Sequence, residues 1–199
     1  MEIMIVAIVV AIVIVVAVLA TKSINSFDVI IEPGSRRAGR DGETAATNAI
    51  KSVLRDGDLL FTNVEISFDG KPAELDNVIV NRFGVFVIEV KNYKGRLYGS
   101  EDDYEWIKYK DDGYGNTFEK KVKNPIKQVK RQVYVLAKYL DYYGLRVWVE
   151  GYALLTQGNS PVDRPCVLSS IADIDRAVHT SGKNRLTKQQ VDSIANLIR

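Results

Sequence analysis

The chain has 199 residues, 46% of them hydrophobic, and a formal net charge of +2. This length predicts one domain of moderate size with a real hydrophobic core, and a net charge so close to zero neither indicates nor excludes a class of partner. One cysteine, Cys166, excludes an intramolecular disulfide and a multi-cysteine zinc site, and one histidine, His179, far along the chain from any nucleophile with an acidic partner, argues against a hydrolase triad.

An apolar segment dominated by Ile, Val and Ala runs from Ile3 to Ala20. At 1.5 Å per residue its length approaches the ~30 Å hydrocarbon core of a bilayer, which predicts a transmembrane helix over residues 1–21. A cleaved signal peptide is the alternative, because Val18-Leu19-Ala20 resembles a cleavage site. Against it, the apolar run is longer than a signal-peptide core, and only Met1 and Glu2 precede it.

Basic residues follow this apolar segment on its C-terminal side. They are Lys22, Arg36, Arg37 and Arg40. The positive-inside tendency then predicts a single-pass membrane protein whose domain faces the cytoplasm. Residues 22–38, which include Pro33-Gly34-Ser35, predict a juxtamembrane linker, so we expect the folded domain over residues 39–199.

A helix is predicted from Asp41 to Arg55, because apolar residues such as Ala46 and Ile50 recur three to four positions apart. Glu43 lies on that apolar stripe. It is either a capping carboxylate near the start of the helix or a further active-site ligand.

Three strands are predicted next, over residues 59–68, 73–80 and 85–91, from their β-branched and aromatic residues and the turns between them. Because side chains alternate along a strand, Glu74 and Asp76 are expected to share one face with Val78 and Val80. By the same rule, Glu89 and Lys91 share one face of the following strand. Three carboxylates and a lysine then converge in an apolar sheet, where buried charges need a partner or a metal.

Hard divalent cations such as Mg²⁺ and Mn²⁺ take oxygen ligands, commonly one or two carboxylates together with water and phosphate oxygens. Asp76 and Glu89 are the natural pair. Lys91, two residues after Glu89, lies beside such a metal, where it can orient or help to deprotonate a water. The alternative is an exposed hairpin with solvated charges, because Glu-x-Lys alone is a common pattern.

Further strands are predicted over residues 96–98 and 105–109, followed by a loop over 111–117. Trp106 is expected to pack in the core rather than to stack on a base. Asn124 caps a helix that begins at Pro125 and ends before Gly144. The chain is completed by a strand over residues 147–156, a short strand over 166–169 and helices over 172–178 and 188–198. Thr187 and Gln190 predict a capping box at the start of the last helix, and His179 is expected at the surface.

A basic cluster leads into and along the helix that begins at Pro125. Its members are Lys120, Lys121, Lys123, Lys127, Lys130 and Arg131. Such a run is often only a solvated helix face, but beside a phosphodiesterase site these cations can neutralise a nucleic-acid backbone. Gln128, off the apolar stripe near the helix start, is expected to face that site and contact substrate.

Several spaced motifs occur in a characteristic order: Gly39-Arg40-Asp41-Gly42-Glu43, Glu74-Leu75-Asp76, Gly84 through Lys91, Trp106, and Asn124-Pro125 followed by Gln128. On these motifs the region from Gly39 to Gln157 resembles the nuclease-related domain (NERD) family, a branch of the PD-(D/E)xK nuclease superfamily. Related superfamily members often have Tyr four residues after the Gln, where this chain has Gln132.

The resemblance implies an α/β, restriction-endonuclease-like fold, in which a mixed, mainly antiparallel central sheet is flanked by helices. It also implies that Asp76, Glu89 and the backbone carbonyl of Val90 hold Mg²⁺ or Mn²⁺. Lys91 then positions the attacking water, and Glu43, for which the resemblance favours the active-site role, and Gln128 assist.

The function expected from these features is hydrolysis of phosphodiester bonds in nucleic acid, with DNA favoured over RNA. The alternative is a non-catalytic module that binds nucleic acid or a protein partner at the membrane.

Overall fold

The computed structural model describes residues 34–111, 113–180 and 185–199. The predicted transmembrane segment, together with residues 22–33 of the predicted linker, lies outside this part of the chain. Within the described ranges, no helix combines the length and the apolar character needed to cross a bilayer. The unit described below runs from Ser35 to Arg199.

The core of this unit is a five-stranded sheet with the strand order β1-β2-β3-β7-β8. Its strands are β1 (Leu59–Phe68), β2 (Lys71–Asn81), β3 (Gly84–Lys91), β7 (Val149–Leu155) and β8 (Val167–Leu168). Neighbours in the β1–β2–β3 half are antiparallel, whereas β7 runs parallel to both β3 and β8. The sheet is therefore mixed, as predicted.

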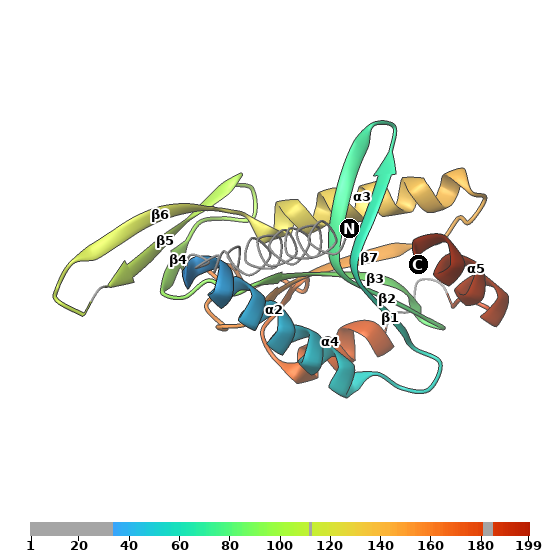
Figure 1. Cartoon of the computed structure of the whole chain (residues 1–199), viewed down its shortest axis with the longest axis horizontal. Coiled ribbons are helices and arrows are strands. Elements are labelled where there is room, and N and C mark those ends of the chain that lie inside the picture. The colour runs from blue at the N-terminus through green and yellow to red at the C-terminus, as the bar shows by residue number, and fades with distance from the viewer. Residues whose placement is uncertain (1–33, 112, 181–184) are drawn as a thin grey trace, which may run out of the picture. The chain divides into compact units, whose positions relative to one another are not determined.

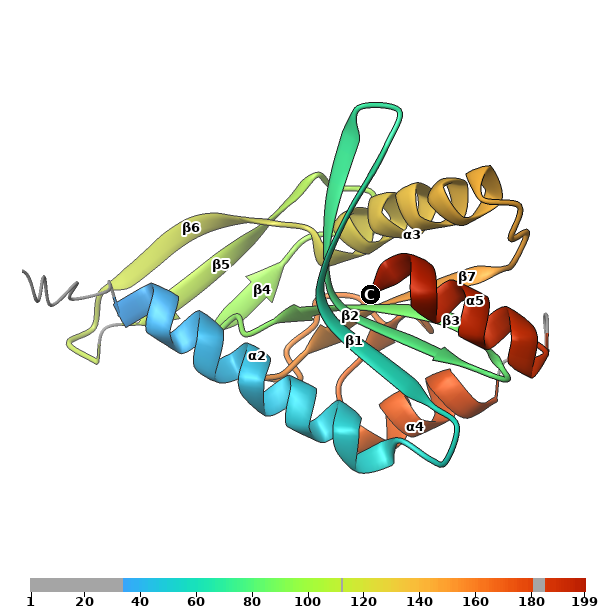
Figure 2. The same cartoon turned by 45° about the vertical axis from the view of Figure 1, so that its right-hand side comes forward.

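Helices cover both faces of this sheet (Figures 1 and 2). They are α2 (Gly34–Val53), α3 (Pro125–Tyr142), α4 (Ile171–His179) and α5 (Lys188–Ile198). On one face, α3 and α5 pack against alternate strand residues such as Val85 and Val87. On the other face, α2 and α4 pack against Phe86 and Ile88. The alternation along β3 therefore produces two apolar cores, which confirms the predicted helix-flanked α/β architecture.

A second, antiparallel sheet lies beside the first and consists of β4 (Arg96–Tyr98), β5 (Glu105–Asp111) and β6 (Thr117–Lys123). A third core joins the two sheets and includes Trp106 and Leu155. Trp106 is fully buried, and its indole N–H donates to the Ser100 carbonyl at 2.8 Å. The prediction that this residue packs in the core is confirmed.

Asn124 fixes the junction between the second sheet and α3. Its side-chain oxygen accepts from the Ile126 N–H at 2.9 Å, which is the predicted helix cap. Its amide nitrogen donates to main-chain carbonyls of Ser100, Glu101 and Asp103, so the same side chain also holds the loop before β5. The predicted Thr187–Gln190 capping box at the start of α5 is present as well.

Two parts of the predicted organisation are different in the structure. The helix expected from Asp41 begins at Gly34, so residues 34–38 of the predicted linker are helical. The segment Thr117–Lys123 forms β6, which was not predicted, and the sheet expected to be single is divided in two. Thr117–Lys123 becomes a strand by pairing with Glu105–Asp111, a tertiary contact that its lysine-rich sequence does not indicate.

Candidate active site

The candidate site forms where β2 separates from β3. The ladder between these strands extends only from Asn77 to Asn81 of β2, and the earlier part of β2 pairs with β1 alone. At this point the Val90 N–H donates to the Asp76 carboxylate at 2.8 Å instead of to a neighbouring strand. Because the N–H and C=O of one strand residue point to the same side, the Val90 carbonyl faces the same gap.

The separation coincides with a break in side-chain alternation. In β1, Phe61 and Val64 both contact the α3-side core, and in β2 the same is true of Leu75 and Val78. These pairs are three residues apart, so the alternation breaks at Asn63 in β1 and at Asp76 opposite it in β2. Asn63 has a left-handed backbone with φ of 53°.

This break corrects one prediction. Glu74 was expected to share a face with Asp76 and Val78, but its side chain is exposed and only its main-chain carbonyl takes part in the site. Two carboxylates converge there rather than three. Asp76, at the position of the break, is half-buried and reaches across to β3.

Glu89 is the buried centre of the site. Glu89 is 0% exposed, and its two carboxylate oxygens have different partners. Oε1 forms an ion pair and hydrogen bond with Lys91 Nζ, and Oε2 accepts from Gln132 Nε2 at 2.5 Å. The same Gln132 nitrogen also donates to the Glu74 carbonyl at 2.8 Å. A side chain from α3 thus links the two strands where their own hydrogen bonds end.

The electrostatics of the site follow from burial and close charges. Burial raises the pKa of Asp76, although the Val90 N–H and Lys91 oppose this effect. Burial also raises the pKa of Glu89, with Lys91 opposing and Asp76 adding to the shift. Burial alone would lower the pKa of Lys91, but the Glu89 carboxylate beside it raises the pKa above its ordinary value. Lys91 therefore remains protonated and acts as a positive charge.

Gln132 is the site residue that the sequence interpretation did not select. Gln128 was chosen instead, but its side chain makes no hydrogen bond within the described residues, and its Oε1 atom is buried without a partner. A signal for Gln132 was present, because it lies three residues after Val129 and four before Leu136, on the buried stripe of α3. An amide on an apolar stripe needs a buried polar partner.

Gly42 and Glu43 bring α2 to the site. A Cβ atom at Gly42 would lie 2.5 Å from the Asn92 side chain, so only glycine permits α2 to approach the segment that follows Lys91 this closely. Glu43 is exposed and lines a cavity of about 330 Å³ together with Asp76. Because α2 begins at Gly34, Glu43 is in the helix interior, and the capping interpretation is wrong.

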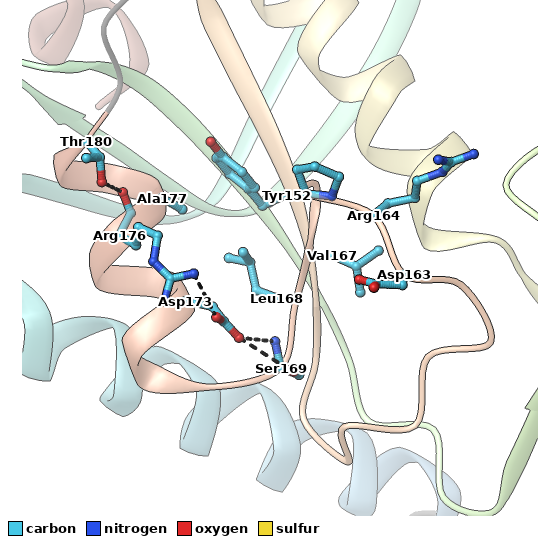
Figure 3. Close-up of a pocket in the computed structure, with 11 residues that line it drawn as sticks. Tyr152, Asp163, Arg164, Val167, Leu168, Ser169, Asp173, Arg176, Ala177 and Thr180 are labelled. Atoms are coloured by element: carbon cyan, nitrogen blue, oxygen red, sulfur yellow. Dashed lines mark hydrogen bonds and ion pairs between the residues drawn. The ribbon is translucent and has the colours of Figure 1, made fainter.

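A larger cavity, of about 820 Å³, lies elsewhere on the fold, between the β7–β8 region and α4 (Figure 3). Among its polar lining residues, Asp173 accepts from Ser169 and forms an ion pair with Arg176 at 3.6 Å. None of the predicted catalytic residues lines it. The chemical groups, rather than cavity size, therefore identify the candidate active site.

The predicted basic cluster does not form one surface. Lys130 pairs with Glu101 at 2.7 Å, and Lys127 and Lys121 lie 3.8 Å from Asp102 and Glu105, respectively. The Arg131 guanidinium donates to the Pro72 carbonyl. Lys120 and Lys123 lie on opposite faces of β6, because their positions differ by an odd number.

His179 is not the surface residue that was expected. It is 8% exposed, and its ring nitrogens lie 2.8 Å from an Asp58 carboxylate oxygen and 2.7 Å from an Asp175 carboxylate oxygen. These contacts connect the end of α4 with the turn before β1. The role of His179 is therefore to join elements of the fold at a distance from the candidate site.

The donor atoms of the site suit a hard divalent cation. Within the described residues, no group of three or more His, Cys, Asp and Glu side chains is arranged to hold a metal ion. Two carboxylates, from Asp76 and Glu89, and the Val90 carbonyl form an all-oxygen set of the kind that Mg²⁺ uses together with water. Each carboxylate oxygen has two acceptor positions, so the bonds that Glu89 receives leave capacity for a cation.

Comparison with known proteins identifies the family of this domain. Residues 38–156 match the family model described as "Nuclease-related domain". An uncharacterized protein of Bacillus anthracis is 30% identical over 69 residues, which are 34% of this chain and 32% of that protein. The chain thus matches about a third of the length of this relative. No solved structure matches the chain.

Proposed function

The chain belongs to the nuclease-related domain family, within the PD-(D/E)xK superfamily, and on this premise we propose that it is a metal-dependent nuclease that hydrolyses phosphodiester bonds. One observation carries the proposal: Glu89, fully buried, is held by Lys91 and Gln132 beside Asp76, at the point where β2 separates from β3. Burying these charges lowers the stability of the fold, and a structural role alone does not require it. Their grouping therefore favours a catalytic role.

In this proposal Asp76, Glu89 and the Val90 carbonyl hold Mg²⁺ or Mn²⁺. The bound cation supplies charge neutralisation at the scissile phosphate and a more acidic water. Lys91, protonated because of Glu89, donates hydrogen bonds to the attacking water or to a phosphate oxygen and stabilises negative charge there. Its raised pKa favours this electrostatic role over that of a general base.

Two further side chains have auxiliary roles. Glu43 lines the cavity next to Asp76 from the α2 side, where an exposed carboxylate can orient water or a hydrated cation. Gln132 fixes the orientation of Glu89, a role that differs from the substrate contact expected from the sequence for Gln128. Nucleic acid is the proposed substrate, with DNA tested before RNA.

Anchoring to a membrane is part of the proposal and is supported by the sequence. The apolar run from Ile3 to Ala20 and the basic residues that follow it favour a single span with the domain in the cytoplasm. In sealed cells, membrane-impermeant labels should then not reach the lysines of the domain. Labelling of these lysines, or a mature protein that begins at Thr21, would refute this topology.

The test of the nuclease proposal combines metal titration by calorimetry with cleavage of labelled single- and double-stranded DNA and RNA. Asp76→Ala and Glu89→Ala should abolish metal-supported cleavage and weaken the uptake of Mn²⁺, because each removes one of two carboxylate ligands. Lys91→Ala should retain metal binding but lower the cleavage rate by about 10²–10⁴-fold.

A non-catalytic module that binds nucleic acid or protein is the second candidate function. It is favoured by one observation, which is that both Glu89 oxygens already have protein partners. Binding of nucleic acid with no metal uptake, and with no cleavage of any of the four substrates, would refute the nuclease proposal and support this module.

A further inference from the structure

One face of the β5–β6 hairpin of the second sheet carries lysines and no described carboxylate, whereas the other face carries charges of both signs. Side chains alternate along each strand, and Lys108 pairs with Lys120 across the ladder. Lys110, two residues from Lys108, lies on the same face. All described carboxylates of the two strands, on Glu105, Asp111 and Glu119, fall on the opposite face by the same alternation.

None of the three lysines has an ion pair with an acidic residue within the described part of the chain, whereas Lys121, on the opposite face, has Glu105 at 3.8 Å. Burial, together with the charges of Lys120 and Lys110, lowers the pKa of Lys108. Like charges directly opposite one another destabilise a sheet, so this arrangement has a cost that an anionic partner would remove.

This lysine face leads toward the candidate active site. The Lys108 ammonium lies 6.0 Å from the centre of the Tyr93 ring. Tyr93 follows Lys91 by two residues and is close enough to Lys91 and Glu89 for their charges to affect its pKa, which burial raises. Trp106, on the same face of β5 as Lys108, is buried in the third core, where it packs with Leu155 of the central sheet.

We propose that Lys108, Lys110 and Lys120 form a track for the sugar–phosphate backbone of the nucleic acid, which extends from the β5–β6 hairpin to Lys91. This inference rests on the proposed function and adds to it the surface that holds substrate. A polyanion fits because this face carries three lysines that have no acidic partner within the described residues, and each phosphate contact releases a counterion. Tyr93 at the inner end offers an aromatic face beside the last lysine.

The proposal replaces the basic cluster expected from the sequence with a different set of residues. Only Lys120 belongs to both sets. Lys108 and Lys110 were not selected because they are separated in sequence from the lysine-rich segment before α3, and they join Lys120 only through the β5–β6 pairing.

The experiment compares two double variants of the purified full chain, each of which removes two exposed lysines from one face of the hairpin. Lys110→Ala with Lys120→Ala changes the proposed track, and Lys121→Ala with Lys123→Ala is the matched control on the opposite face. Binding of fluorescent DNA is measured in EDTA over a range of salt concentrations, so that cleavage does not contribute.

The track variant should reduce the slope of log affinity against log salt by about 1.4 for single-stranded and about 1.8 for duplex DNA, whereas the control should retain the parental slope. Equal losses in both variants, or no loss in either, would overturn the track. Loss of binding to phosphatidylserine vesicles, with DNA binding unchanged, would also overturn it and assign the face to a membrane surface.

Cleavage assays on the same proteins separate this inference from the nuclease proposal. If the parent cleaves DNA and the track variant keeps the parental slope, the track is refuted and the nuclease remains. If the slope falls as expected but no metal supports cleavage by the parent, the track stands as a binding surface and the nuclease proposal fails.

Discussion

Replacement of Gln132 tests whether this side chain holds the buried carboxylate in position. Gln132→Ala removes the donor to Glu89 Oε2 and to the Glu74 carbonyl. A buried acceptor left without its partner costs about 1–3 kcal/mol, so two of them cost about 2–6 kcal/mol. The variant also removes the buried, unpartnered Gln132 Oε1, which relieves a penalty of about 1–3 kcal/mol.

The expected net loss is therefore about 1–3 kcal/mol in the free energy of unfolding. For a domain of this size it corresponds to a fall in Tm of about 2–12 °C. Because Gln132 positions Glu89 without touching substrate, metal-supported cleavage should fall by about 10–100-fold. Gln132→Met keeps a similar volume and should show most of the same losses, which separates hydrogen bonding from packing.

Gln128→Ala is the matched control on the same helix, one turn earlier. Its side chain makes no hydrogen bond within the described residues and its Oε1 is buried without a partner, so this substitution should not lower the free energy of unfolding by more than about 1 kcal/mol. Thermal unfolding and single-turnover cleavage of the three variants measure both effects. A Gln128→Ala loss equal to or greater than that of Gln132→Ala would refute the assigned role.

Two further predictions concern the fold. Gly151→Ala should cost about 1–3 kcal/mol, because its Cβ would lie 2.9 Å from the Val129 side chain and closer still to Val133, and adding Val133→Ala should restore part of this loss in chemical denaturation. Hydrogen bonding to His179 lowers the pKa of Asp175 in the folded protein, so the stability that this carboxylate contributes is present above its unfolded-state pKa, near pH 4, and is lost as pH falls below that value. In urea unfolding, Asp175→Asn should therefore lose less stability than the parent between about pH 5 and pH 3. Equal losses would contradict the assignment of this pH dependence to Asp175.

The sequence by itself determined the local elements and indicated most residues of the candidate site. Alternation and turn residues predicted the β2–β3 hairpin, and side-chain type predicted the Asn124 cap and the Thr187–Gln190 capping box. These features depend on residues within a few positions of one another, where backbone geometry is fixed by local sterics and hydrogen bonds. The pairing of Asp76 with the Glu89–Lys91 segment followed from the same local rules.

Only the tertiary structure decided which side chains meet. The Glu74 side chain lies outside the site because side-chain alternation breaks at Asn63 and Asp76. A regular strand, in which side chains alternate every residue, does not predict such a break. Gln132 reaches Glu89 because α3 packs over the sheet, 43 positions away along the chain. Lys108 joins Lys120 through strand pairing. Strand register and helix packing depend on the apolar surface that the whole domain buries. Residues distant in sequence therefore become neighbours although no local sequence pattern indicates it.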